Sequence, residues 1–518
     1  KGSGARASAS IRPPVLAPTE LLNADPVAAA AAAQPFAPSA GDAPARGGIG
    51  ALVRRHPRAV LTTALGVGFL LLASGALLAG VSIGSASAAA VLPDVSTTPT
   101  PDPRPLPAAI ADPSRLRTCS IAAFAQDERL TTLFGSVVNT ATGELLWDRQ
   151  ATTPAPTASV LKILTGAVAL STLGPDYRLS TRVVAGSTPG TVVLIGGGDA
   201  TLSRLPAGQE SVYPGAPKLA DLAAQTVAAY ATANPDAPGI AEVVLDATYW
   251  SVADRWDSSW DRSLQTSGYT SEVTALQVDG DRDDPRSAIS PRSTDPVGRA
   301  GAAFATALAD AGNPDGVPSV SLGSAVSTTA LAQVQSQPVS ALVAYMIDTS
   351  DNTVAEMLAR VSSRVIGFDG SAASLTRTFA GALDTYGVST TGITVRDGSG
   401  LSNLNAVPAQ YVAELLVVVN GGGQNLSIIG GAFAIAGVSG DLAQRFTGAN
   451  AIARGAVLGK VGWIDSARTL AGIVRAADGS VLTFSFSAVR ENVSASTREA
   501  LDTLTTGVFS CGDNLSNN

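Results

Sequence analysis

A serine and a lysine in this chain have the spacing that nucleophilic catalysis requires. Ser159 and Lys162 open an apolar run with helical periodicity, residues 159–170. Positions i and i+3 share one face of a helix, so the lysine ammonium is expected one turn from the serine hydroxyl. A lysine whose pKa is lowered by desolvation or by a nearby cation can take the proton of a serine nucleophile. The spacing predicts a nucleophile and its base, with a solvated surface lysine as the alternative.

Two further segments carry polar residues where apolar patterns are interrupted. Ser350-Asp351-Asn352 separates two apolar helical patterns and predicts a hydroxyl and an amide in a loop between helices. Asn, Asp and Ser also form helix caps readily, so a cap junction is the alternative. Lys460 and Gly462 lie on a predicted edge strand, where they could hold a substrate carboxylate beside a groove. A charged edge residue that discourages aggregation would look the same.

Scarce residue types exclude other chemistries. The chain has one histidine, His56, and two cysteines, so a zinc site built on several histidines and an iron–sulfur cluster are both excluded. If His56 lies outside the folded domain, no Ser-His-Asp triad is possible, and acid–base work must fall to Lys, Asp, Glu, Tyr or Ser. The net charge of −8 argues against a nucleic-acid partner, which requires basic surface.

The N-terminal part of the chain predicts a membrane anchor. Residues 1–58 are rich in Ala, Pro, Gly and Ser and are expected to be a disordered cytoplasmic segment. Residues 59–84 are apolar, uncharged and long enough for a transmembrane helix. Three arginines precede this helix, so the rest of the chain is expected outside the cell membrane: Arg54, Arg55 and Arg58. A Pro-rich linker over 85–118 would follow. A cleaved signal peptide is the alternative.

The two cysteines lie near the ends of the remaining chain. A disulfide between Cys119 and Cys511 would join both ends of one globular unit in an oxidising exterior. Two unpaired buried thiols are the alternative.

The exterior region is expected to have an α/β (α+β) fold with a central antiparallel sheet flanked by helices. Residues 134–148 read as a hairpin, and strands are expected over 455–463, 468–475 and 481–489, with a closing helix over 494–509. The catalytic domain is expected in two parts, 119–180 and 286–515, around an inserted domain over 181–285. An aromatic cluster is expected in the core of the insert, with stacking on wall glycan as the alternative: Trp250, Trp256, Trp260 and Tyr269.

Taken in order, Ser-x-x-Lys, Ser-Asp-Asn and Lys-x-Gly form the motif set of penicillin-binding proteins and class A β-lactamases. The chain resembles more narrowly the D-alanyl-D-alanine carboxypeptidase/endopeptidase family of class C low-molecular-mass penicillin-binding proteins, the DacB-like S13 peptidases. Residues 196–202, Gly-Gly-Gly-Asp-Ala-Thr-Leu, are similar to that family's GGGD-P-T-L segment. Residues 397–402 match its Asp-Gly-Ser-Gly-Leu-Ser segment. The long separation of Ser159 from Ser350 fits a family that inserts extra domain material there.

The resemblance implies the penicillin-binding-protein/β-lactamase-like fold and an enzyme that cleaves peptidoglycan peptides, is acylated by β-lactams and needs no cofactor. In this family pattern Ser159 would attack the carbonyl and Lys162 would take its proton. Ser350 would relay a proton to the leaving amine, and Asn352 would orient Lys162 and the substrate amide. Lys460 would supply positive charge for the substrate carboxylate.

One departure concerns the strand that binds the substrate. The family usually has Lys-Thr-Gly-Thr, whereas this chain has Val461, Gly462 and Trp463 after Lys460. Backbone N–H groups of Ser159 and Trp463 would form the oxyanion hole. Val461 has the shape of threonine but cannot donate a hydrogen bond. A non-catalytic peptidoglycan-binding protein on the same fold is therefore the alternative function, followed by a β-lactamase or esterase.

Overall fold

The structure is a computed structural model that describes residues 116–236 and 239–518. The expected disordered segment 1–58, the expected transmembrane helix 59–84 and residues 85–115 of the expected linker lie outside the described residues. Within the described ranges, no helix has the length and hydropathy needed to cross a membrane.

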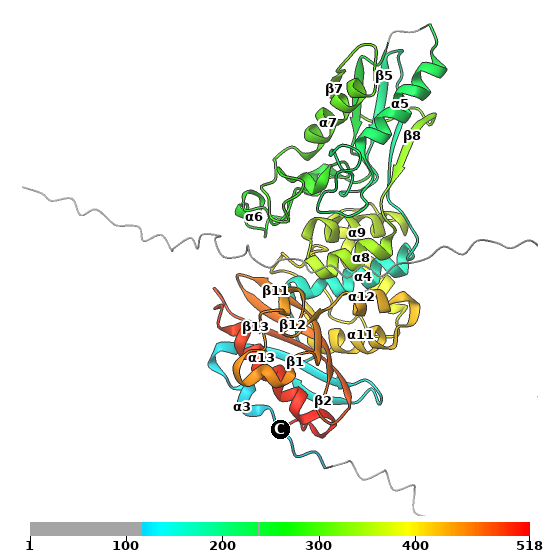
Figure 1. The fold of residues 1–518 in the computed structure, drawn as a ribbon. Coiled ribbons are helices and arrows are strands. Elements are labelled where there is room, and N and C mark those ends of the chain that lie inside the picture. Colours follow the sequence, from blue (N-terminus) through cyan, green and yellow to red (C-terminus); the bar gives the residue numbers. More distant parts are fainter. Residues whose placement is uncertain (1–115, 237–238) are drawn as a thin grey trace, which may run out of the picture. The chain divides into compact units, whose positions relative to one another are not determined.

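The catalytic sheet is antiparallel and six-stranded, in the order β10-β11-β12-β13-β1-β2. Its strands are β1 (Thr132–Asn139), β2 (Leu145–Arg149), β10 (Ala434–Ile435), β11 (Val457–Ile464), β12 (Ala467–Arg475) and β13 (Val481–Val489). The first and last segments of the domain are thereby side by side, because β1 pairs with β13 along its whole length (Figure 1). The expected antiparallel sheet and its hairpins are confirmed.

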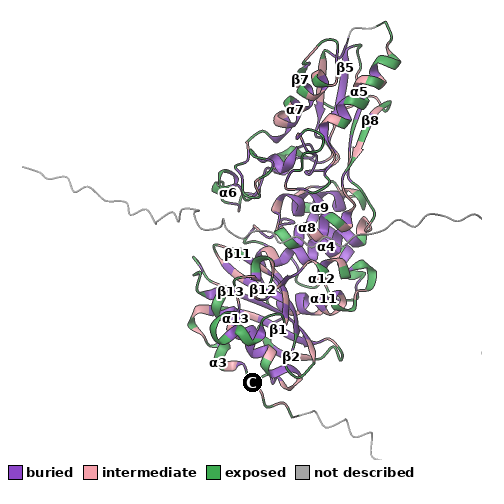
Figure 2. Ribbon diagram, viewed as in Figure 1, coloured by how far each residue is buried: buried purple, intermediate pink, exposed green. Residues whose placement is uncertain are grey.

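Both faces of this sheet are covered, so most residues of its long strands are buried, polar ones included (Figure 2). Neighbouring residues of β12 point to opposite faces. Leu470 packs in the core beneath the closing helix α13 (Thr497–Cys511) and the short α3 (Ala122–Ala125). Ala471 packs on the other side, in the core of the helical layer.

The helical layer surrounds one helix that is buried on every side. It comprises α4 (Leu161–Thr172), α8 (Val339–Thr349), α9 (Asn352–Val365), α10 (Leu375–Asp384), α11 (Ala409–Gly421) and α12 (Ser427–Gly431). Every residue of α4 from Leu161 to Leu170 is buried, as expected for a helix that is apolar all round. The start of α4, which carries Lys162 and follows the turn with Ser159, is therefore held by packing on all faces.

The inserted unit is a second sheet with its own helices. Its strands follow the order β7-β6-β5-β4-β8 and comprise β4 (Ser180–Ala185), β5 (Thr191–Ile195), β6 (Glu242–Asp246), β7 (Ser319–Leu322) and β8 (Ala330–Gln335). The strands β5, β6 and β7 are parallel, and their crossovers carry α5 (Leu219–Ala233) and α7 (Pro296–Asp310). The last strand of this sheet, β8, ends at Gln335, so the boundary expected at 285 falls too early. The strands β7 and β8 are short and half polar, and only their pairing reveals them.

The disulfide between Cys119 and Cys511 is present, with 5.4 Å between the Cα atoms. It joins the start of the catalytic domain to the end of α13, and Ser516 N–H donates to the Cys119 carbonyl oxygen beside it. The expected pairing is confirmed, and the alternative of two free thiols is excluded.

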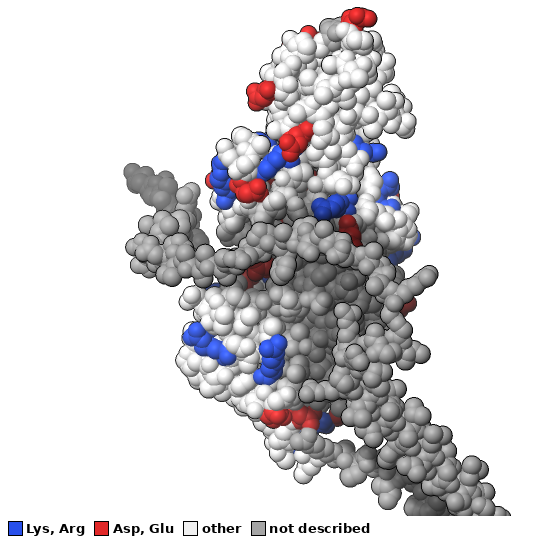
Figure 3. Space-filling model, turned by 45° about the vertical axis from the view of Figure 1, so that its right-hand side comes forward, with Lys and Arg blue, Asp and Glu red and all other residues white. Residues whose placement is uncertain are grey.

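Short elements complete the described chain. A two-stranded ladder joins β3 (Pro154–Ala155) to β9 (Val407–Pro408), and α6 (Ser263–Thr266) lies in the insert. Charged side chains are sparse on the described face in Figure 3, in keeping with a charged fraction of 15%.

Candidate active site

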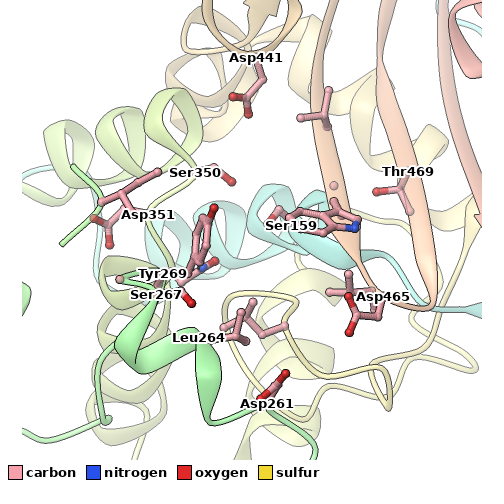
Figure 4. A pocket seen from close by; sticks show the side chains of 18 of the residues that line it. Ser159, Asp261, Leu264, Ser267, Tyr269, Ser350, Asp351, Asp441, Asp465 and Thr469 are labelled. Carbon is pink, nitrogen blue, oxygen red and sulfur yellow. Dashed lines mark hydrogen bonds between the residues drawn. The ribbon is translucent and has the colours of Figure 1, made fainter. Parts of the chain in front are cut away.

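The five residues expected to be catalytic meet in one place. Ser159 lies in the 3₁₀ turn Ala158–Val160 that leads into α4. Ser350 ends α8, Asn352 begins α9 and Lys460 lies on β11. A pocket of about 730 Å³ is lined by Ser159, Ser350 and Asn352, and both the catalytic domain and the insert contribute to its walls. Figure 4 shows Ser159 between Ser350 on one side and the strand that carries Thr469 on the other.

The Lys162 side chain is fully buried and fully hydrogen-bonded. Its Nζ lies 3.0 Å from Ser159 Oγ, 2.6 Å from Asn352 Oδ1 and 2.7 Å from the Ser399 carbonyl oxygen. These are three acceptors for the three donors of an ammonium group. Burial and the nearby Lys460 lower the pKa of Lys162 to about 7. A substantial fraction is therefore neutral at neutral pH and can accept the Ser159 proton.

Close backbone approaches hold the serine in place. A Cβ atom on Gly462 would lie 2.8 Å from Ser159 N, so β11 can reach the nucleophile only with glycine there. Ala158, directly before the serine, has φ 45, in the left-handed region that L-residues disfavour. Thr469 on β12 donates its hydroxyl to the Thr157 carbonyl oxygen at 2.8 Å. The turn is thus fixed against the sheet from both neighbouring strands.

Ser350 and Lys460 form the second polar pair. Ser350 has φ 58 and ψ 32 at the end of α8, which is a strained conformation for a residue other than glycine. Its Oγ accepts from Lys460 Nζ at 2.9 Å. Lys460 is 3% exposed, and burial lowers its pKa. The alternative of a solvated edge charge is therefore wrong, because Lys460 points into the site.

The Ser-Asp-Asn segment is both a cap and a part of the site. Asp351 Oδ1 accepts from Val354 N–H and caps α9, as the alternative interpretation expected. Its Oδ2 accepts from Arg282 of the insert at 2.8 Å, and Arg282 holds the pKa of Asp351 below its usual value despite burial. Asn352 Nδ2 donates to the Tyr269 carbonyl oxygen at 3.0 Å. The insert therefore helps to position the site residues.

Tyr269 differs from the expectation for the aromatic cluster. Trp250 and Trp260 are buried in the core of the helical layer and not in that of the insert, and Trp256 packs against the same core. Tyr269 is 44% exposed and lines the pocket. Nothing in the local sequence distinguishes Tyr269, the one member of this cluster that lines the pocket, from the other three.

Glu356 is a functional candidate that the sequence reasoning missed. It is 1% exposed, and its carboxylate accepts from Ser399 N–H at 2.8 Å and from Gly398 N–H at 3.0 Å. The carbonyl oxygen of the same Ser399 receives the Lys162 ammonium. Burial and the nearby Asp397 raise the pKa of Glu356 to about 7. The sequence offered one signal for Glu356, which is a charged residue four positions after Asn352 inside a buried helix.

The strand residues expected to bind substrate lie along one side of the pocket. Val461 is partly buried and packs against the core under α13, and Trp463 is 52% exposed. β10 pairs only with Leu458 and Gly459, so β11 beyond Gly459 has no neighbouring strand on that side in the described chain.

Across residues 116–236 and 239–518, no group of three or more His, Cys, Asp or Glu residues is placed to hold a metal ion.

Comparison with known proteins gives relatives along most of the described chain. The model of the "D-Ala-D-Ala carboxypeptidase 3 (S13) family" matches residues 117–288 and 282–508. The carboxypeptidase DacB of Mycolicibacterium smegmatis is 34% identical over 401 residues, which cover 77% of this chain and 84% of that protein. A carboxypeptidase of Mycobacterium tuberculosis is 33% identical over 401 residues, covering 76% and 84%.

Solved structures agree on the fold. Penicillin-binding protein 4 (DacB) of Haemophilus influenzae superposes with a TM-score of 0.61 at 18% identity, covering 75% of this chain and 98% of that one. The mixed α+β penicillin-binding-protein fold expected from the motifs is confirmed. The family match over most of the described residues, together with the two carboxypeptidase relatives, shows that this chain belongs to the D-Ala-D-Ala carboxypeptidase 3 (S13) family.

Proposed function

We propose that this protein is a serine-type D-Ala-D-Ala carboxypeptidase that hydrolyses peptidoglycan peptides through an acyl-enzyme on Ser159. Membership of the S13 family supports the reaction class. The observation that carries the assignment is the fully buried Lys162 amine, 3.0 Å from Ser159 Oγ and with a pKa of about 7. A base with a pKa near the working pH is the most effective one.

Acylation follows from this geometry. Ser159 Oγ attacks the carbonyl carbon of the penultimate D-alanine while its proton passes to neutral Lys162. Backbone N–H groups of Ser159 and Trp463 stabilise the oxyanion. The proton on Lys162 then passes through Ser350 Oγ to the amine of the leaving D-alanine, and Lys460 keeps the Ser350 hydroxyl oriented.

Deacylation completes the cycle without a cofactor. Water attacks the ester carbonyl of the acyl-enzyme, Lys162 takes a proton from the water, and Ser159 recovers its proton as it leaves. The peptide is released with a new terminal carboxylate. We include cleavage of cross-link peptide bonds in the proposal, because the open edge of β11 suits an extended peptide.

We also propose a single-pass membrane anchor at residues 59–84 with the catalytic domain outside the cell. The uncharged apolar run and the preceding arginines support this topology. The disulfide supports an oxidising compartment for the catalytic domain. Protease protection of the full chain in sealed vesicles tests the anchor.

Labelled penicillin tests the catalytic proposal against its alternatives. We expect the full chain to form a stable adduct that mass spectrometry places on the peptide with Ser159. Ser159→Ala should abolish labelling, whereas Ser171→Ala, an exposed serine on the same helix, should not change it. Rapid turnover of the label would identify a β-lactamase. Absence of labelling would identify a non-catalytic binder, the role that the loss of a threonine at Val461 favours.

A further inference from the structure

The site has a shortage of free groups for the terminal carboxylate of the substrate. Val461 offers no hydroxyl. The ammonium of Lys460 is already engaged by Ser350 Oγ at 2.9 Å, the Val461 carbonyl oxygen at 3.2 Å and Asp441 Oδ2 at 3.6 Å. A carboxylate that leaves water needs a charged partner or several donors. Another cation near β11 would supply such a charged partner.

We infer that Arg468 on β12 binds the terminal carboxylate of the substrate in place of the missing hydroxyl, an inference that rests on the proposed carboxypeptidase function. Arg468 stands directly opposite Trp463 in the antiparallel pair of β11 and β12. Directly paired residues share a face of the sheet, and Val461, two positions from Trp463, shares that face as well. Arg468, Trp463 and Ser159 all line the same pocket.

The Arg468 guanidinium is positioned but has no polar partner. Its Cζ lies over the Trp463 ring, 4.6 Å from the centroid. Within the described residues it makes no hydrogen bond and no ion pair, and its Nε is buried without an acceptor. Arg445 nearby is different, because Asp502 binds it at 2.7 Å. A buried donor without a partner is costly, so an acceptor is expected at Arg468 when the site is filled.

The charges around Arg468 are mixed, with Arg445 and Arg498 on one side of the balance and Asp465 on the other. Arg498 also lines the pocket, and among the residues that the structure describes its guanidinium donates only to the Ala495 carbonyl oxygen, at 3.4 Å. Partial burial, with Arg498 and Arg445 nearby, lowers the pKa of Arg468 below the usual arginine value. An arginine fork matches the two oxygens of a carboxylate, and stacking on Trp463 holds the plane of the fork in advance.

Paired substrates separate carboxylate binding from mere support of Trp463. The full chain is assayed with an acyl-D-Ala-D-Ala peptide and with the C-terminal amide of the same peptide. We expect Arg468→Gln to lower kcat/KM for the carboxylate peptide about ten- to a hundredfold. The kcat/KM for the amide peptide should stay nearly unchanged. Arg468→Lys should recover part of the loss, because it restores the charge but not the fork. Arg475 is exposed at the far end of the same strand, and Arg475→Gln should keep the preference for the carboxylate peptide over the amide.

An equal loss of kcat/KM with both peptides, which leaves the ratio of the two values unchanged, would overturn the inference. Arg468 would then be a support for Trp463.

Binding to Ser159→Ala, measured by calorimetry, gives a readout that needs no acylation. The carboxylate peptide should bind about tenfold or more tightly than its amide, and adding Arg468→Gln should abolish this difference. If the carboxylate peptide binds more tightly than its amide but penicillin does not acylate the parent, the proposed reaction is refuted and the role of Arg468 is retained. Equal binding of both peptides, or no binding of either, would refute that role.

Discussion

At Ser159, activation depends on a lysine that is neutral because of its surroundings. The Lys162 amine has lost its hydration and lies near the positive Lys460, and both effects lower its pKa to about 7. Asp397 and Glu356 act in the opposite direction and limit the decrease. The serine–lysine spacing is a property of the sequence, but the basicity of Lys162 is a property of the packed site.

This pKa predicts the pH dependence of acylation. The base is active when neutral, so protonation below the pKa removes it. We expect the second-order rate of penicillin acylation to fall about tenfold per pH unit well below pH 7 and to level off above it. Stopped-flow measurement across pH 5 to 9 in buffers of constant ionic strength checks this. An acid limb centred near pH 4, where ordinary carboxylates titrate, would contradict the assignment of Lys162 as the base.

Val461 provides a second test at the residue scale. Val461→Thr keeps the β-branched shape on β11 and adds a donor beside the pocket. A hydrogen bond to a charged group contributes about 1.5–3 kcal/mol. If it forms mainly in the transition state, acylation should accelerate roughly ten- to a hundredfold. The matched control is Val461→Ala, which removes volume without adding a donor. A rate for Val461→Thr no higher than the parent rate would show that the hydroxyl is not limiting.

At the element scale, α9 links the site to the loop that receives Lys162. Its first residue, Asn352, contacts Lys162 directly, and Glu356 one turn later holds the backbone of residues 398–399. The Ser399 carbonyl oxygen then accepts from Lys162. One helix therefore orients the base through two separate contacts.

Glu356→Gln tests this positioning role. Glu356 Oε1 accepts from both backbone N–H groups at 398–399, and Oε2 accepts a second time from Gly398 N–H. Glutamine can keep the bonds to its single oxygen, but it loses the charge and turns an NH₂ donor toward Gly398 N–H. We expect kcat to fall about tenfold or more, with less effect on KM. Removing the negative charge should also shift the acid limb of the pH profile downward, because Glu356 raises the pKa of Lys162. Glu414→Gln on α11 serves as the control. A lower melting temperature with an unchanged pH profile would indicate a purely structural role.

At the scale of the whole molecule, the catalytic domain is closed by contacts between its two ends. β1 pairs with β13, and Cys119 is bonded to Cys511. A disulfide that closes so long a loop limits the freedom of the unfolded chain, and removing a native disulfide typically costs about 2–5 kcal/mol.

The double variant Cys119→Ser/Cys511→Ser should therefore unfold at a lower temperature than the parent. Calorimetric scans at one fixed rate, with and without reductant, measure this. Reductant should lower the parent transition toward that of the variant and leave the variant unchanged. Labelling of two thiols in the denatured, unreduced parent would refute the bridge.

Local patterns in the sequence determined much of the catalytic domain. Helical periodicity after Ser159 and the alternation in residues 457–489 predict elements that are present, because burial of one face leaves a short-range signature. The order of the three motifs indicated the family. The cysteine positions indicated the disulfide, with free thiols as the open alternative.

Only the tertiary structure decided how the insert ends and how the site is completed. β7 and β8 are too short and polar to be recognised without their partners, so the boundary at 285 was misplaced. Glu356 and Arg468 belong to no motif in the sequence, and Tyr269 was expected in a core and not at the site. They border or support the site because α9, the insert and β12 bring them there from distant positions. Such contacts depend on strand register and helix packing across hundreds of residues, and no local pattern encodes them.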